Sequence, residues 1–161
     1  MTATMPAAFG PRRYFGDGHV SERPITATRA PACSRKIGIE FRYDPAEPFA
    51  VTLVLGYRHG AGELLKSWTF ARSMLAAGRT EPAGADAGDV QLFPRAGRVD
   101  VDLADRAEGR RYLLTVRKAD VDAALAEFDK VVPLAAEDNI APRYDAIAAE
   151  LAAILADGGD R

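Results

Sequence analysis

Cysteine and histidine are scarce in this chain of 161 residues, which has one cysteine, Cys33, and two histidines, His19 and His59. A single cysteine cannot form a disulfide within the chain, so nothing in the sequence indicates an oxidising compartment. The two histidines lie far apart in glycine-rich turns, whereas zinc sites gather three or four ligands in closely spaced pairs. The sequence therefore predicts no metal site, and Cys33 is interpreted as a small side chain near a strand rather than as a catalytic thiol.

Long apolar runs are missing as well. No stretch approaches the roughly 18–20 residues that a membrane span needs, and residues 1–31 lack the apolar core of a secretion signal. The formal net charge is −2, which argues against broad electrostatic attraction to nucleic acid or to an anionic membrane. These absences predict a soluble, cytoplasmic protein without direct membrane insertion.

The common catalytic and nucleotide-binding motifs are also absent. There is no Gly-x-Gly-x-x-Gly between a strand and a helix, no Gly-Lys-Ser/Thr and no Gly-x-Ser-x-Gly. Asp100 and Asp102 share one face of a predicted strand, but such a face normally carries solvated charge. These absences argue against a conventional hydrolase and against nucleotide binding through those motifs, and the residues indicate no catalytic, cofactor-binding or metal-binding site and no cofactor.

The length fits one domain, which we place at residues 25–157. Residues 1–24 have no clear hydrophobic period and are predicted to be a flexible tail, and residues 158–161 a disordered end. A short strand at Ile25–Ala30 would add a fourth strand to the first half of the domain.

Hydrophobic periodicity predicts the remaining elements. Strict alternation is clearest at Ile37–Tyr43, where a turn rich in proline follows. Thr69 is expected to cap the first helix, and Gly78 to end it in the left-handed conformation. The expected strands are Ile37–Tyr43, Phe49–Tyr57, Glu63–Thr69, Asp89–Phe93, Arg98–Leu103 and Arg110–Arg117, and the expected helices are Phe70–Ala77, Ala119–Val131 and Arg143–Ala156.

The order is three strands and a helix, then three strands and a helix, then a terminal helix. Short consecutive strands joined by tight turns favour antiparallel sheets, so the predicted fold class is α+β.

Two groups of side chains remain open to more than one interpretation. Four aromatic residues fit the core better than a docking patch, because each lies on the apolar side of its element: Trp68, Phe70, Phe93 and Tyr112. A basic cluster could contact nucleic acid, but acidic residues are interleaved with it, so this binding is not favoured: Arg42, Arg58, Arg110, Arg111, Arg117 and Lys118.

Three segments resemble the SsgA-like proteins, a family of actinomycete sporulation and cell division proteins. They are Arg42-Tyr43-Asp44-Pro45-Ala46-Glu47-Pro48-Phe49-Ala50-Val51, then Trp68-Thr69-Phe70-Ala71-Arg72 with Leu75 and Gly78, then Gly88-Asp89-Val90-Gln91-Leu92-Phe93-Pro94. The terminal Glu150-Leu151 with Ile154-Leu155 is also similar. Against this pattern, the long first strand of the family is represented only by the short segment Ile25–Pro31.

The resemblance implies an antiparallel fold similar to the whirly proteins and a homotrimer. It also implies a non-enzymatic adaptor at the division septum that acts in septum-site selection and FtsZ ring assembly, with FtsZ or another SsgA-like protein as partner. Two alternatives stay open, a module that binds single-stranded nucleic acid and a regulator of peptidoglycan-remodelling enzymes. The sequence identifies no partner-binding residues, because the matched residues look like determinants of the fold.

Overall fold

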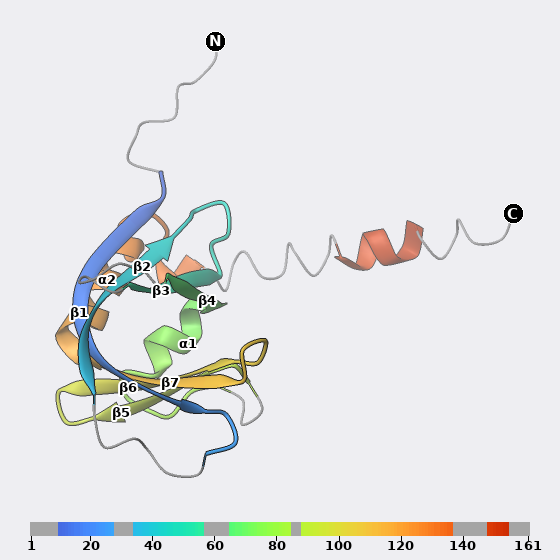
Figure 1. Ribbon diagram of the computed structural model, residues 1–161. Coiled ribbons are helices and arrows are strands. Elements are labelled where there is room, and N and C mark those ends of the chain that lie inside the picture. The colour runs from blue at the N-terminus through green and yellow to red at the C-terminus, as the bar shows by residue number, and fades with distance from the viewer. Residues whose placement is uncertain (1–9, 28–33, 57–64, 85–87, 137–147, 155–161) are drawn as a thin grey trace, which may run out of the picture.

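The computed structural model describes residues 10–27, 34–56, 65–84, 88–136 and 148–154 (Figure 1). The elements are β1 (Arg12–Pro24), β2 (Arg35–Tyr43), β3 (Ala50–Gly56), β4 (Lys66–Ala71), α1 (Arg72–Ala77), β5 (Val90–Arg95), β6 (Arg98–Asp105), β7 (Arg110–Arg117) and α2 (Lys118–Asp129). A short 3-10 turn at Leu134–Ala136 follows α2, and residues 148–154 are helical.

All seven strands belong to one sheet with the order β4-β3-β2-β1-β7-β6-β5. Every pair of neighbouring strands is antiparallel, which confirms the predicted α+β class. Strands β2 to β4, which precede α1, form one half of the sheet, and β5 to β7, which follow α1, form the other. β1 lies between the halves and pairs with both β2 and β7.

The prediction of a flexible tail over residues 1–24 is wrong for residues 12–24, because they form the central strand β1. His19 therefore lies in a strand and not in a turn, whereas Ile25 and Thr26, predicted to be part of a strand, form a turn. The alternation in β1 is weak because Gly16 and Gly18 occupy positions that face the core. A Cβ at Gly18 would lie 2.8 Å from Leu114 Cδ1, so close packing against β7 excludes a larger residue there.

The predicted positions of the other strands are confirmed to within a few residues. The turn after β2 is fixed by Tyr43, whose hydroxyl donates to the Pro48 carbonyl at 3.2 Å. Residues Val51, Leu53 and Leu55 of β3 are buried on one side, as alternation predicts. Several predictions lie outside the described residues, among them the turn with His59, the position of Cys33 and the end of the chain.

Helix α1 begins two residues later than predicted and ends at Ala77 as predicted, but the predicted Thr69 cap and the predicted left-handed conformation of Gly78 are wrong. Its N-cap is Ala71, without a side-chain hydrogen bond, because Thr69 and Phe70 are still part of β4. Gly78 has φ −62°, so it is not in the left-handed conformation. Glycine is needed there because a Cβ would lie 2.6 Å from Leu92 Cβ.

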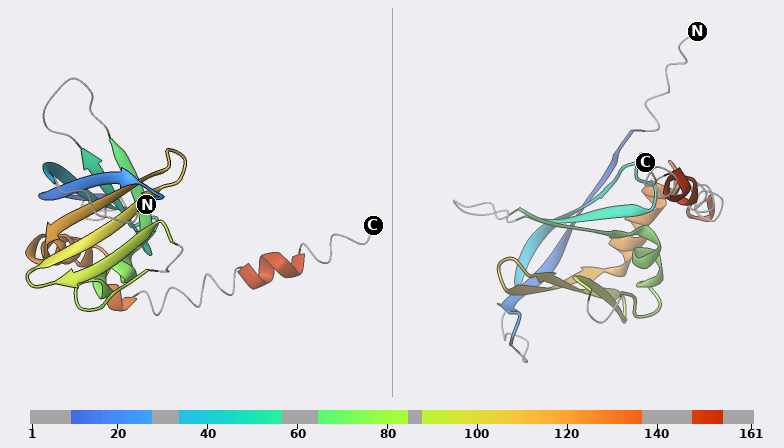
Figure 2. Two further views of the ribbon diagram at one scale, coloured as in Figure 1. Left: turned by 60° about the horizontal axis from the view of Figure 1, so that its bottom comes forward. Right: turned by 90° about the vertical axis from the view of Figure 1, so that its right-hand side faces the viewer.

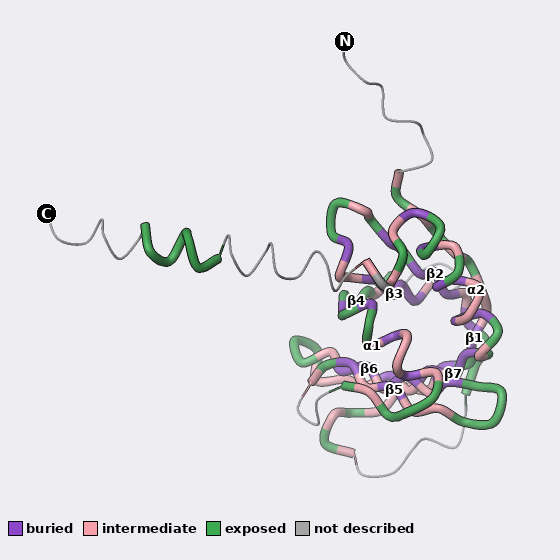
Figure 3. Tube along the Cα trace, turned by 180° about the vertical axis from the view of Figure 1, so that it is seen from behind, coloured by how far each residue is buried: buried purple, intermediate pink, exposed green. Residues whose placement is uncertain are grey.

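The sheet curls around both helices, which lie in its hollow (Figures 1 and 2). Figure 3 shows buried residues recurring along the strands and along α2, and the core that they form contains residues of both. Trp68 of β4 donates its indole N–H to the Ala104 carbonyl of β6 at 3.0 Å and meets Tyr112 of β7 edge to face. Lys66 pairs with Asp105 and Glu108, so side chains close the curl between the two halves.

Helix α2 lies at its predicted place, and Val121, Ala124, Leu125 and Phe128 are its buried apolar residues. Residues 148–154 confirm part of the predicted terminal helix, the rest of which lies outside the described residues. On this helix Leu151 and Ile154 are 55% and 62% exposed.

Candidate interaction surface

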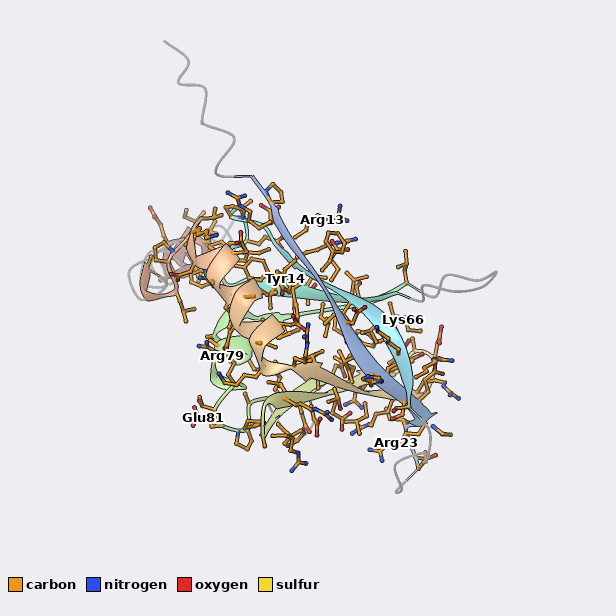
Figure 4. All side chains as sticks on the ribbon, turned by 90° about the vertical axis from the view of Figure 1, so that its left-hand side faces the viewer. Arg13, Tyr14, Arg23, Lys66, Arg79 and Glu81 are labelled. Carbon is orange, nitrogen blue, oxygen red and sulfur yellow. The ribbon has the colours of Figure 1, made fainter. Side chains whose placement is uncertain are left out.

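The sheet has an inner face, packed on the helices, and an outer face that they leave uncovered. Side chains of a strand alternate between faces, and the register of the strands places each residue on one of them. Figure 4 shows Arg13 and Tyr14 of β1 on opposite sides of the strand. Tyr14 points inward, where its hydroxyl donates to Asp120 of α2 at 3.0 Å, so Arg13 belongs to the outer face.

The outer face is basic although the chain is not. By strand alternation it carries seven basic side chains, which are Arg13, Arg23, Lys36, Arg42, Arg95, Arg98 and Arg111, and an eighth, Arg117, that pairs with Asp120 of α2. It carries four acidic side chains, which are Asp17, Glu40, Asp100 and Asp102. The whole chain has a formal net charge of −2, so positive charge is concentrated on this face.

Glu40 organises the part of the outer face near the start of β1. Arg13 Nε lies 2.5 Å from Glu40 Oε1, and Arg42 donates to both carboxylate oxygens at 2.7 and 3.2 Å. Burial by itself raises the pKa of Glu40, but the hydrogen bonds from Arg42 and Arg13 outweigh it and hold the pKa below its ordinary value. Two guanidinium groups thus share one carboxylate, which leaves one positive charge uncompensated.

Large apolar side chains are exposed beside this cluster. Phe15 is 62% exposed and lies opposite Glu40 in the register of β1 and β2. The Arg13 guanidinium lies 5.6 Å from the centre of the Phe15 ring, within the range of a cation–π interaction. Leu65, just before β4, is 64% exposed.

Two hollows indent this region of the outer face. The first, of about 450 Å³, is lined in part by Arg13, Arg42 and Thr52. The second, of about 340 Å³, is lined in part by His19, Lys36, Arg98 and Arg117. Both are open and lined by charged groups. Such hollows are suited to contact with the side chains of a partner more than to enclosing a small molecule.

The structure separates the residues considered earlier as candidate sites. Asp100 and Asp102 do share the outer face, where Asp100 accepts from Thr115 and Arg95 and Asp102 accepts from Arg111. The basic cluster is divided, because Arg110 binds Glu22, Arg117 binds Asp120 and Lys118 binds Asp122, all away from the outer face. Within the described residues, no three or more His, Cys, Asp or Glu side chains gather in a way that could hold a metal ion.

The aromatic residues are mainly part of the core. Trp68, Phe70 and Tyr112 are buried, as predicted, whereas Phe93 is only partly buried on the outer face of β5. Sequence patterns gave no indication of Phe15, because it lies in the segment predicted as a tail. The only sequence signal for a strand there is that the charged residues Arg13 and Asp17 occupy odd positions while Tyr14 occupies an even one.

Arg72 ends the Trp-x-Phe-Ala-Arg segment and is fully buried. It donates to the Tyr43 hydroxyl at 3.1 Å and to the Val132 carbonyl at 2.6 Å, and it lies over the Tyr43 ring. Tyr43 in turn stacks on Phe128 of α2. Arg72 therefore joins α1, β2 and the end of α2, and its role is architectural.

The family model for the Streptomyces sporulation and cell division protein SsgA matches residues 37–137. This chain belongs to the SsgA family. The matched part of this SsgA-family chain runs from β2 to the 3-10 turn after α2. It leaves β1, and with it Arg13 and Phe15, outside the match.

Curated relatives agree with membership of the SsgA family. The sporulation-specific cell division protein SsgB of Frankia casuarinae is 37% identical over 123 residues, which is 74% of this chain and 79% of the relative. SsgB of Streptomyces coelicolor is 32% identical over 118 residues, or 72% and 80%. The family and these relatives support a role for this chain in cell division during sporulation.

Solved structures of the SsgA family share the fold. One is SsgB from work reporting that mutations in SsgB correlate to longitudinal cell division during sporulation of Streptomyces coelicolor. It is 26% identical, covers 80% of this chain and 95% of its own, and has a TM-score of 0.60. An SsgA-like sporulation-specific cell division protein from Thermobifida fusca, 20% identical with coverages of 92% and 98%, has a TM-score of 0.63. In the described part of this chain, no helix has the length and hydrophobicity of a membrane span.

Proposed function

We propose that this protein is a non-enzymatic adaptor of sporulation-specific cell division, acting in septum-site selection and FtsZ ring assembly through protein–protein contacts. The observation that carries the proposal is the family match over residues 37–137, together with relatives named for this process. The outer face supports it further, because arginine and exposed aromatic side chains are enriched where proteins meet. The protein acts at the septum as a homo-oligomer, for which a trimer is favoured.

Imaging of a fluorescent fusion during sporulation tests this function. We expect the fusion to gather at division sites together with the FtsZ ring, and a deletion strain to place its septa abnormally. A fusion that stays diffuse throughout sporulation, in a strain whose deletion mutant divides normally, would refute the proposal. Pull-down with FtsZ and with peptidoglycan synthases as separate preys distinguishes action on the ring from regulation of cell-wall enzymes.

The surplus of basic residues on the outer face favours one second candidate, a module that binds single-stranded DNA. Fold alone is weak support for it. Fluorescence anisotropy with labelled single-stranded DNA at low salt decides the matter. Binding that weakens steeply with salt would support this candidate, and no signal at tens of micromolar protein removes it.

A further inference from the structure

The region around Phe15 combines exposed apolar area with positive charge, and we call it the Phe15 patch: Arg13, Phe15, Lys36, Glu40, Arg42 and Leu65. Phe15 is on the central strand of the sheet, where burial is normally easiest, and yet it is 62% exposed and lies outside the hydrophobic core. Between Phe15 and Leu65 the outer face presents the paired glycines Gly38 and Gly56. Adjacent strands are about 4.8 Å apart and three such spacings separate β1 from β4, so the two apolar side chains lie roughly 15 Å apart, which an extended peptide of about five residues spans.

The charges of the Phe15 patch select the kind of partner. Arg13 and Arg42 share Glu40, and Lys36 is 70% exposed with its Nζ 3.9 Å from Asp17 Oδ2. The neighbouring hollow adds Arg98, whereas its Arg117 is paired with Asp120 of α2, so cations still outnumber carboxylates across the region. A partner that is acidic gains from this field, and one that is basic is repelled.

We propose that the Phe15 patch docks an acidic segment of a partner protein that places an apolar side chain on Phe15. The proposal rests on the adaptor function and names the surface and the chemistry of the partner. Arginine beside an exposed aromatic ring is the composition typical of binding hot spots, where a few residues supply most of the affinity. The apolar contact at Phe15 provides affinity, and the surrounding cations provide orientation and a fast encounter.

A protein segment fits this surface better than a nucleic acid. Single-stranded nucleic acid binds along several stacked aromatic rings, whereas in the described residues the outer face offers only Phe15 as a largely exposed ring, with Phe93 partly buried three strands away on β5. Glu40, Asp17, Asp100 and Asp102 are spread through the face and repel a continuous row of phosphates. The carboxylates of an acidic peptide are separate side chains, so they can lie beside the arginines and lysine of the outer face without lying next to its carboxylates.

Peptide binding to the full chain tests the proposal in vitro. The probes are a short fluorescent peptide of Asp and Glu residues around one Phe, the same peptide with Ala for Phe, a Lys and Arg counterpart, and oligothymidine. We expect the acidic Phe peptide to bind most tightly and to weaken with salt. Phe15→Ala should weaken it about tenfold, because the contact area of one aromatic side chain is lost.

Charge is tested with a matched pair of variants. Lys36→Glu reverses one charge in the Phe15 patch and should lower the affinity for the acidic peptide by about threefold to fivefold. Lys130→Glu makes the same change just after α2, at a side chain that is similarly exposed, 65% against 70%, and should leave the affinity unchanged. Unfolding midpoints of all the variants should match the parent, since each altered side chain is largely exposed.

Several results would overturn the Phe15 patch as an acidic docking site. They are equal affinity for the acidic and basic peptides, tighter binding of oligothymidine, and no loss of affinity in Phe15→Ala. A change of molecular mass in Phe15→Ala by light scattering would mean that the patch contacts a second copy instead, and would also overturn it.

Imaging separates this proposal from the function on which it rests. A parent fusion at the septum with diffuse Phe15→Ala and Lys36→Glu fusions supports both. If the parent and both variants reach the septum equally, the Phe15 patch is refuted and the adaptor function stands. If the parent itself is diffuse, the adaptor function fails, whatever the peptide titrations give.

Discussion

Gly78 is a glycine because of its neighbour and not because of its backbone angle. A Cβ there would lie 2.6 Å from Leu92 Cβ and 2.9 Å from Leu92 Cδ2, so the two elements would have to move apart. We expect Gly78→Ala to lower the free energy of unfolding by about 1–3 kcal/mol, the usual cost of overpacking. Urea denaturation measures it. Gly56→Ala is the control, because its Cβ meets Leu65 Cδ2 at an ordinary 3.4 Å, and equal effects of the two variants would contradict this account.

Glu40 is expected to make the folded protein less stable as the pH falls into the acid range. Its pKa is lower in the folded protein, so its contribution is present above the ordinary glutamate pKa of about 4.3 and is lost as pH falls through the lowered value. Glu40→Gln should cost about 1–2 kcal/mol at neutral pH, a value kept small because both arginines are half exposed.

Chemical denaturation between neutral pH and pH 3 tests this expectation. The curves of stability against pH for Glu40→Gln and the parent should converge as the parent carboxylate becomes protonated. Glu47→Gln, in the exposed turn after β2, provides the control. If the curves of Glu40→Gln and the parent stayed parallel over the whole range, Glu40 would not be the source of the loss of stability at acid pH.

Arg72 decides how the elements at one end of the molecule are joined. Its guanidinium is fully buried among Tyr43, Val132 and Asp129, so removing it leaves acceptors without their donor. We expect Arg72→Met to lower the free energy of unfolding by about 3 kcal/mol. Arg72→Lys should recover little of this loss, because an ammonium group lacks the planar set of donors with which the guanidinium reaches several partners at once. Urea denaturation measures both. Arg106→Met is the control, because this arginine is exposed and its loss should change the free energy of unfolding little. An equally small effect of Arg72→Met would contradict this account.

Strict alternation made β2, β3, β6 and β7 predictable at the scale of elements, since each buries one face. β1 was missed because Gly16 and Gly18 replace apolar residues on its inner face, where the packing is too tight for a larger side chain at Gly18. The role of Arg72 was missed for another reason, because Val132 lies 60 residues away and Tyr43 29 residues away. Local patterns carry no information about such contacts.

The same limits apply to the candidate interaction surface. Arg42 could be noticed as an outward residue of a regular strand, whereas Arg13 and Phe15 went unrecognised together with β1. The basic surplus of the outer face is also hidden in the composition, because the acidic residues that bring the net charge to −2 lie mostly elsewhere. Only the register of the strands separates the two faces.

At the scale of the whole molecule, light scattering tests the trimer that the family resemblance implies. We expect a mass of about three times 17.3 kDa. The helical residues 148–154 give a physical reason, because Leu151 and Ile154 are largely exposed there and a second copy would cover them. The mass of a monomer at working concentration would contradict the expectation. Lys130→Glu serves as a control, because a change of surface charge alone should leave the measured mass unchanged.

β1 is the strand that joins the two halves of the sheet. A chain that starts after residue 24, or at the first matched residue of the family, would hold two three-stranded sheets with no backbone hydrogen bond between them. Removing it would expose one further strand edge on β2 and one on β7, and such edges invite pairing with other chains. Residues 12–24 therefore protect the protein from aggregation, and any shortened version meant to remain in solution has to keep them.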